Sequence, residues 1–441
     1  MKISLPYFRN RRYLRGIDWV VGALHDDARK RVGVGAVSQA IIEVEGRLDE
    51  GQIRDVLDRI SKRFPLVHGR FARDWFNLAP YWKSPRAGEF PIPLEVRDAS
   101  SLEQADRLLA DHVNTPFTSD SEHLRFMLVQ FGAGRSELGL VFDHRLLDAY
   151  GAESFFRLMD ETLAGRLEEV APKISVTEPA HLDHWKRRMR SGRMLNRMLI
   201  KLQEKDVCAL AMPTPLKGRH ARFVHEAMKV EESAGLIGRA FGEIGVPVLL
   251  PCAAARAVAA VRGVVTEPGL AGSQYLLFTT VNMRPPGDEW GSMFLNHFSF
   301  LFFSAPCEGP TVIPELAGGL RDQLFSNMKD QMPAAMEDAA ALGRIFPRPL
   351  VARLINSMFK GRMCSFYFAC LKDSGYPGTE FMGRKVVNLV HTPLAFAPPG
   401  LNLCMTWYGG HFNLVLSYFE GAIGDEAARG VLRKFKESLV G

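Results

Sequence analysis

A histidine and an aspartate lie four positions apart in the stretch VFDHRLLDAYG, which covers residues 141–151. Neutral imidazole is the usual side-chain base near neutral pH. His144 and Asp148 are therefore candidates for a general base and the carboxylate that supports it. The residues alone leave two alternatives open, a structural histidine and a metal ligand. No further ligands with metal-binding spacing are found for the second.

The flanking sequence predicts that this pair lies where a strand meets a helix. Residues 137–143 form an apolar run in which Leu138, Leu140 and Phe142 share one parity, and His144 falls on the same parity. A helical stripe follows over about 152–167. The ends of strands commonly border ligand clefts in mixed sheets, so His144 could be held rigidly and still reach a substrate.

The rest of the chain predicts an α/β protein. It has 441 residues, of which 47% are hydrophobic and 24% charged, and this length suggests two or three domains. Strand and helix patterns alternate in both halves. The predicted organisation is an N-terminal subdomain over residues 1–175, a linker over 176–218 and a C-terminal subdomain over 219–441.

The linker contains a basic helix over residues 184–202, rich in lysine and arginine and with an apolar stripe at helical spacing. Its simplest interpretation is a solvated face above a packed stripe. A functional interpretation is contact with CoA phosphates, or peripheral contact with a membrane or lipid surface.

Composition and local motifs limit the binding partners, metal sites and cellular location that the sequence allows. The net charge of +6 allows an acidic or phosphorylated partner, but no motif supports nucleic-acid binding. The six cysteines have no zinc-ligand spacing, and we expect free thiols in a reducing cytoplasm. No secretory signal is recognised, and the best apolar run, 246–261, is too short to span a bilayer. The expected location is cytoplasmic.

An ordered set of motifs resembles the CoA- and carrier-dependent acyltransferase superfamily. His144 to Asp148 resembles the core of its His-His-x-x-x-Asp-Gly motif. Pro116-Phe117 with Leu124-Arg125-Phe126 is similar to the segment upstream of that motif. The strand 280–284, which ends in Arg284, and the hairpin and helix after Leu401 also agree in type and order. The family includes chloramphenicol acetyltransferase, condensation domains, alcohol acyltransferases and wax ester synthases.

This resemblance implies two chloramphenicol-acetyltransferase-like α/β sandwich domains with the active-site channel between them. It implies transfer of an acyl group from a CoA or acyl-carrier-protein thioester to an alcohol or amine. His144 would act as general base without an acyl-enzyme, and Asp148 would pair with Arg284 to hold the loop. The thioester is a co-substrate, and no cofactor is expected. Ser365, by its strand position, and backbone N–H groups are the two candidates for the oxyanion stabiliser.

Two positions depart from the motif. Asp143 replaces its first histidine, and Ala149 replaces its glycine. An alanine would be costly if the glycine were needed for a positive φ or for close packing, and Gly151 could then take over the turn. These departures support the rival hypothesis of a catalytically inactive relative that acts as a binding or scaffold protein.

Overall fold

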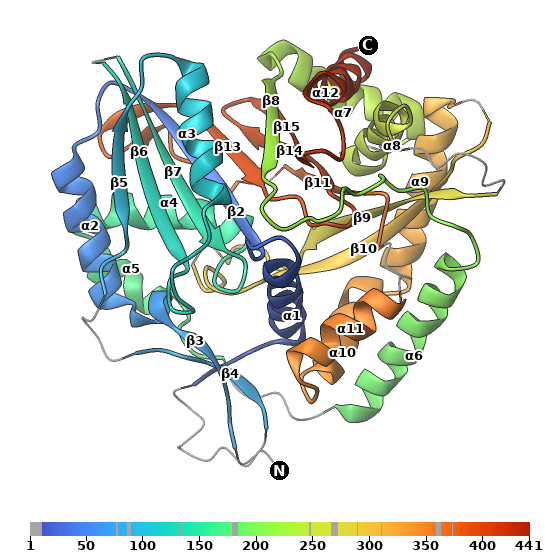
Figure 1. Cartoon of the computed structure of the whole chain (residues 1–441), viewed down its shortest axis with the longest axis horizontal. Helices are drawn as coiled ribbons and strands as arrows, with labels where there is room; N and C mark the ends of the chain where they lie inside the picture. The colour runs from blue at the N-terminus through green and yellow to red at the C-terminus, as the bar shows by residue number, and fades with distance from the viewer. Residues whose placement is uncertain are drawn as a thin grey trace.

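The computed structural model describes most of the chain, and its helices and strands form two lobes (Figure 1). Each lobe is built on one sheet whose strands alternate with helices, as the sequence pattern predicts. The described residues are 11–75, 78–85, 90–132, 134–178, 184–246, 248–265, 272–288, 290–309, 311–358, 363–372 and 374–441.

The sheet of the N-terminal lobe has the strand order β12-β13-β2-β7-β6-β5. β7 is central, and it pairs antiparallel with β2 on one side and with β6 on the other. The strands are β2 (Val37–Glu45), β5 (Leu94–Asp98), β6 (Leu124–Phe131), β7 (Arg135–Asp143), β12 (Glu380–Phe381) and β13 (Arg384–Pro393).

Helices cover both faces of this sheet. Leu138, Leu140 and Phe142 of β7 lie in one buried apolar cluster with α2 (Glu50–Arg63) and α4 (Ala149–Leu163), so the predicted parity of β7 is confirmed. On the opposite face, Val141 of β7 lies in one cluster with Val113 of α3 (Leu102–Asn114), and Met127 and Val129 of β6 lie in another with Leu109 of α3. β7 is therefore a buried, rigid support for the residue that follows it.

The sheet of the C-terminal lobe has the strand order β10-β9-β11-β14-β15-β8. One face packs against α7, α8, α9 and α12. The elements are β8 (Ala221–Ala227), β9 (Gln274–Asn282), β10 (Phe298–Pro306), β11 (Phe366–Leu371), β14 (Leu401–Tyr408), β15 (His411–Phe419), α7 (Val230–Ile244), α8 (Leu249–Val261), α9 (Ile313–Lys329) and α12 (Asp425–Val440). The predicted β14–β15 hairpin is present.

A strand from the second half of the chain completes the first sheet. β13 pairs antiparallel with β2, although residues 384–393 fall within the predicted C-terminal subdomain. This strand was not predicted from the sequence. The lobes are thus joined by a shared strand as well as by the linker.

The remaining elements lie around the junction of the lobes and at the edge of the molecule. α1 packs on α10 and α11, and α6 packs on α10 (Figure 1). The elements are α1 (Gly16–Arg31), α5 (Leu167–Val170), α6 (Trp185–Leu202), α10 (Met332–Gly343), α11 (Arg348–Met358), β1 (Arg12–Tyr13), β3 (Arg70–Arg73) and β4 (Pro80–Lys83). The predicted basic helix is therefore present as α6.

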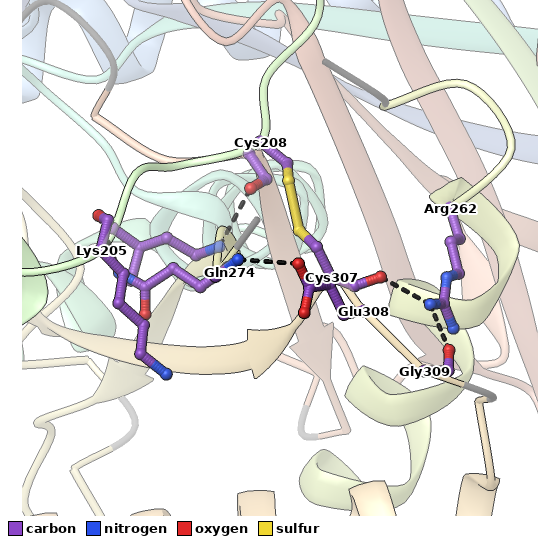
Figure 2. The surroundings of a disulfide bond; sticks show 10 residues. Lys205, Cys208, Arg262, Gln274, Cys307, Glu308 and Gly309 are labelled. Atoms are coloured by element: carbon purple, nitrogen blue, oxygen red, sulfur yellow. Dashed lines mark hydrogen bonds between the residues drawn. A yellow bond between two sulfur atoms is a disulfide. The ribbon is translucent and has the colours of Figure 1, made fainter. Parts of the chain in front are cut away.

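The expectation of six free thiols is wrong for two of the cysteines. Cys208 and Cys307 form a disulfide beside Gln274, whose carbonyl accepts a hydrogen bond from the Cys208 N–H at 2.9 Å (Figure 2). The spacing of 99 residues carries no sequence signal for such a pair. The other four cysteines are free.

In the described part of the chain, no single helix has the length and hydropathy of a membrane span. α7 and α8 together have that length and hydropathy, but a 90° bend separates them. No group of three or more His, Cys, Asp or Glu side chains among the described residues could hold a metal ion.

Candidate active site

His144 follows the last residue of β7, and its backbone is held from two sides. Its N–H donates to the Ala36 carbonyl at 3.0 Å, which extends the pairing with β2. Its carbonyl accepts from Nδ2 of Asn296 at 2.7 Å. Asn296 belongs to the segment before β10, in the second half of the chain. The backbone of His144 is thus fixed by contacts with both lobes.

His144 is half-buried as a residue. Its Nε2 lies 2.9 Å from the Ser38 hydroxyl, and the edge of the ring packs on Phe142. Nδ1 is buried and has no hydrogen-bond partner among the described residues. The arrangement leaves Nε2 as the ring atom in contact with a hydroxyl group.

Burial lowers the pKa of His144, because a charged ring loses solvation there. His391 acts in the same direction, whereas Asp148 and Asp143 oppose the shift. At neutral pH the ring is therefore neutral and able to accept a proton.

Asp148 makes the predicted ion pair with Arg284. Nη2 of Arg284 lies 2.6 Å from Oδ1 of Asp148, and both side chains are buried. The carboxylate also accepts from the N–H groups of Gly151, at 2.9 Å, and His297, at 3.0 Å. Asp148 thus caps the N-terminus of α4 and binds the second half of the chain at the same time.

The segment 290–297 forms the other wall of this contact. The Leu295 N–H donates to the Leu146 carbonyl at 2.6 Å, and Leu295 has a φ of 68°. Such backbone is unfavourable for a leucine and persists where the surroundings determine it. A Cβ on Gly151 would lie 2.3 Å from the Met293 carbonyl oxygen, so only glycine allows this approach.

The backbone at Ala149 does not require the positive φ that a glycine allows. Ala149 is the first residue of α4 and is not among the described residues with positive φ. The glycine that close packing requires is Gly151, as the sequence analysis allowed. It acts through the close approach of the backbone and not through its φ.

Asp143 lies in a buried network of charged and ring groups. Its carboxylate accepts from the Arg145 N–H at 2.8 Å and from the Arg145 guanidinium at 2.6 Å. His123 and His25 lie 3.1 and 3.3 Å from it. Burial by itself raises the pKa of Asp143, but Arg145 and His25 outweigh it and hold that pKa well below its usual value.

A second histidine, which was not among the predicted site residues, lies on the same side of the sheet. His391 of β13 is opposite Ala40, two residues along β2 from Ser38, so side chains 38 and 40 share a face. Nε2 of His391 lies 2.7 Å from Glu153 of α4. The signal was present, because His391, like His144, follows an apolar strand pattern.

Ser365 makes its contacts elsewhere. Its hydroxyl is fully buried and accepts a hydrogen bond from the Leu276 N–H of β9 at 2.9 Å. These contacts are with β9 and not with the loop that carries His144. The assignment of Ser365 as oxyanion stabiliser stays a prediction.

No known family model and no curated protein sequence matches the chain. Solved structures do match it over nearly its whole length. Trichothecene 15-O-acetyltransferase from Fusarium sporotrichioides aligns with a TM-score of 0.68 and 10% identity, covering 100% of this chain and 99% of that one. The first condensation domain of the calcium-dependent antibiotic synthetase, in complex with a substrate analogue, gives 0.66 and 15%, covering 98% and 95%.

An epimerization domain from tyrocidine synthetase B is also similar, with a TM-score of 0.60 and 12% identity over 98% of this chain and 96% of that one. The chain therefore has the two-lobed fold that these proteins share. The predicted architecture of two chloramphenicol-acetyltransferase-like sandwiches is confirmed.

Proposed function

We propose that this protein transfers an acyl group from a thioester to an alcohol or amine, with His144 as the general base. Nε2 takes the proton of the acceptor as its oxygen or nitrogen attacks the thioester carbonyl. The carbon–sulfur bond then breaks, and the leaving thiolate takes the proton back from the ring. Atoms and electrons balance in these steps without an oxidant or a cofactor.

One observation carries the proposal, the placement of a half-buried histidine with a neutral ring whose backbone is held by both lobes. A base held in this way avoids the entropic cost of positioning it anew in each turnover. Ion pairing between Asp148 and Arg284 keeps the loop in place without making Asp148 part of the chemistry. The fold, which an acetyltransferase and condensation domains share, supports the same reaction class.

Ser38 marks where the acceptor would bind. Its hydroxyl contacts Nε2 at 2.9 Å, the distance at which an acceptor hydroxyl would transfer its proton. The same contact would also suit a serine nucleophile activated by a histidine. Direct transfer predicts no adduct on Ser38 when the protein is mixed with an acyl-CoA, whereas a serine acyl-enzyme would appear in intact-protein mass spectrometry.

The test is thiol release from a panel of acyl-CoAs and acylated carrier proteins, with simple alcohols and amines as acceptors. We expect His144→Ala to lower the rate about 10²–10⁴-fold, the usual contribution of a general base. His220→Ala is the matched control, because His220 is exposed and lies in another part of the chain. Equal rates in the parent and His144→Ala would instead favour the inactive binding or scaffold protein.

A further inference from the structure

The outward face of α6 carries exposed apolar side chains. Trp185, Met189 and Ile200 are 46%, 49% and 55% exposed, which is high for residues of this size. The opposite face packs on the protein through Leu199 and the half-buried Met198. Figure 1 shows α6 at the outer edge of the molecule, with α10 on its inner side.

A basic stripe runs beside this apolar one. It follows positions three or four apart, which lie along one side of a helix. Its members are all exposed, and they are Lys186, Arg190, Arg193, Arg197 and Lys201. The apolar positions 185, 189 and 200 fall next to them on the helix surface, so the outward face has an apolar half and a basic half.

The charges of the basic stripe are not neutralised within the described residues. Arg187, at its margin, pairs with Asp338 of α10, but no ion pair is found there for the five members of the stripe. α6 itself contains no acidic residue in its 18 positions. A row of unpaired cations along a helix about 27 Å long attracts an extended anionic surface more than a single small anion.

We propose that α6 is an interfacial helix that holds this protein on a bilayer with anionic headgroups. The apolar stripe, with Trp185 at one end, would enter the boundary between headgroups and acyl chains. The basic stripe would meet the lipid phosphates. This combination of an apolar and a basic face is typical of helices that lie in the membrane interface.

Lipid fits this face better than nucleic acid. Phosphate-backbone binding needs the cations but leaves three large apolar side chains in water. Burial of those side chains in a lipid surface uses both halves of the face. The proposal is independent of acyl transfer, since its test measures binding and not turnover.

The test is flotation of the full chain with vesicles of phosphatidylcholine alone and of phosphatidylcholine mixed equally with phosphatidylglycerol. The charge variant combines Arg190→Glu, Arg193→Glu and Arg197→Glu. The apolar variant combines Trp185→Ser, Met189→Ser and Ile200→Ser. The matched control combines Arg429→Glu, Arg433→Glu and Lys434→Glu, exposed positions on α12 with the same change in net charge.

We expect the parent and the control to float with the anionic vesicles only. The charge variant should partition at least about a hundredfold less, since each of the three lost cations contributes about a fivefold gain and the three glutamates add repulsion. The apolar variant should also bind less. Thermal melting of every variant separates loss of binding from loss of folding.

Three outcomes would overturn the proposal. The first is a parent that stays with the soluble fraction in the presence of anionic vesicles. The second is a charge or apolar variant that floats as the parent does. The third is a parent that does not bind vesicles but is retained by RNA or by an acidic carrier protein. The outward face of α6 would then be a binding site for that partner.

Discussion

Two carboxylates flank His144, and the structure holds them in different ways. Asp143 pairs with groups of its own lobe, chiefly Arg145. Asp148 reaches across to Arg284 and to the backbone of the segment before β10. Both are buried, but the first secures the end of β7 within one lobe and the second connects the two lobes. The chain before His144 is therefore held by contacts within one lobe, and the chain after it is held by contacts between the lobes.

The pKa values of the two carboxyl groups reflect this difference. Burial raises both, but Arg145 holds the pKa of Asp143 well below its usual value, and Arg284 lowers that of Asp148. Both groups are charged at neutral pH. Removing either carboxylate leaves a buried arginine without its partner. The position of that arginine determines whether stability or activity is affected more.

The largest effect on stability is expected for Asp143→Ala. Without the carboxylate, Arg145 stays buried near two histidines, and an uncompensated buried charge costs about 3–5 kcal/mol. Urea unfolding of the variant should show this loss. Asp143→Asn is the control, since it keeps the side-chain volume and some hydrogen bonds and should cost less. A variant as stable as the parent would mean that the network is not a structural anchor.

Arg284→Ala should be milder in stability and more severe in activity. Asp148 keeps two backbone N–H donors, so we expect a loss of about 2–3 kcal/mol. The loop that carries His144 would lose its tie to the other lobe, and thiol release should fall further than unfolding of the protein explains. Arg284→Lys keeps the charge but not the fork and should recover only part of the rate. If activity fell only by the fraction of protein that is unfolded, Arg284 would not position the loop that carries His144.

The sequence predicted the elements whose signal is local. The parity of β7, the β14–β15 hairpin and the basic helix α6 each rest on periodicity within one short stretch, and all are present. β13 was not predicted, although the apolar pattern before His391 is as local as the others. What no local pattern gives is its partner, because β13 pairs with β2, which lies far away in the sequence.

The same limit applies to the site. His144, Asp148 and Arg284 were found through an ordered resemblance, and the ion pair between the last two is present. Ser38 and Asn296 were not found, since each is brought to His144 by contacts between segments more than a hundred residues apart. Neither residue has a local feature that distinguishes it from other serines and asparagines.

Lowering the pH tests which charges hold the protein together. Burial lowers the pKa of His112 to about 3 and that of His297 to about 4, against an ordinary value of 6.5. Below pH 6.5 these two histidines therefore bind protons in the unfolded chain but not in the folded chain. Their contribution to the free energy of unfolding falls as the pH drops. We expect a loss on the order of 1–2 kcal/mol for each histidine at pH 5.

Asp143 and Asp148 contribute little to the pH dependence in this range. Their stabilising effect, which comes from lowered pKa values, is fully present above about pH 5 and is lost as the pH falls further. Glu137 and Asp160 oppose the histidines, because burial raises their pKa values to about 7 and about 6 and each group adds stability as the pH falls. Urea unfolding at pH 7.5 and pH 5 is therefore compared between the parent and His112→Phe, which should lose less stability at pH 5. The same change in both proteins would show that His112 is not buried in the neutral form.

The smallest effect is expected for Ala149→Gly, which restores the motif's glycine. Ala149 begins α4 with ordinary backbone, so a glycine there gains no space and adds freedom to the unfolded chain. The expected loss is below about 1 kcal/mol, with no gain in thiol release. Gly151→Ala is the informative partner, because its Cβ would lie 2.3 Å from the Met293 carbonyl and push the segment before β10 away from Asp148. Should Ala149→Gly raise the rate while Gly151→Ala leaves it unchanged, the loop would need freedom at the first position, and the contact between the lobes would not be what positions His144.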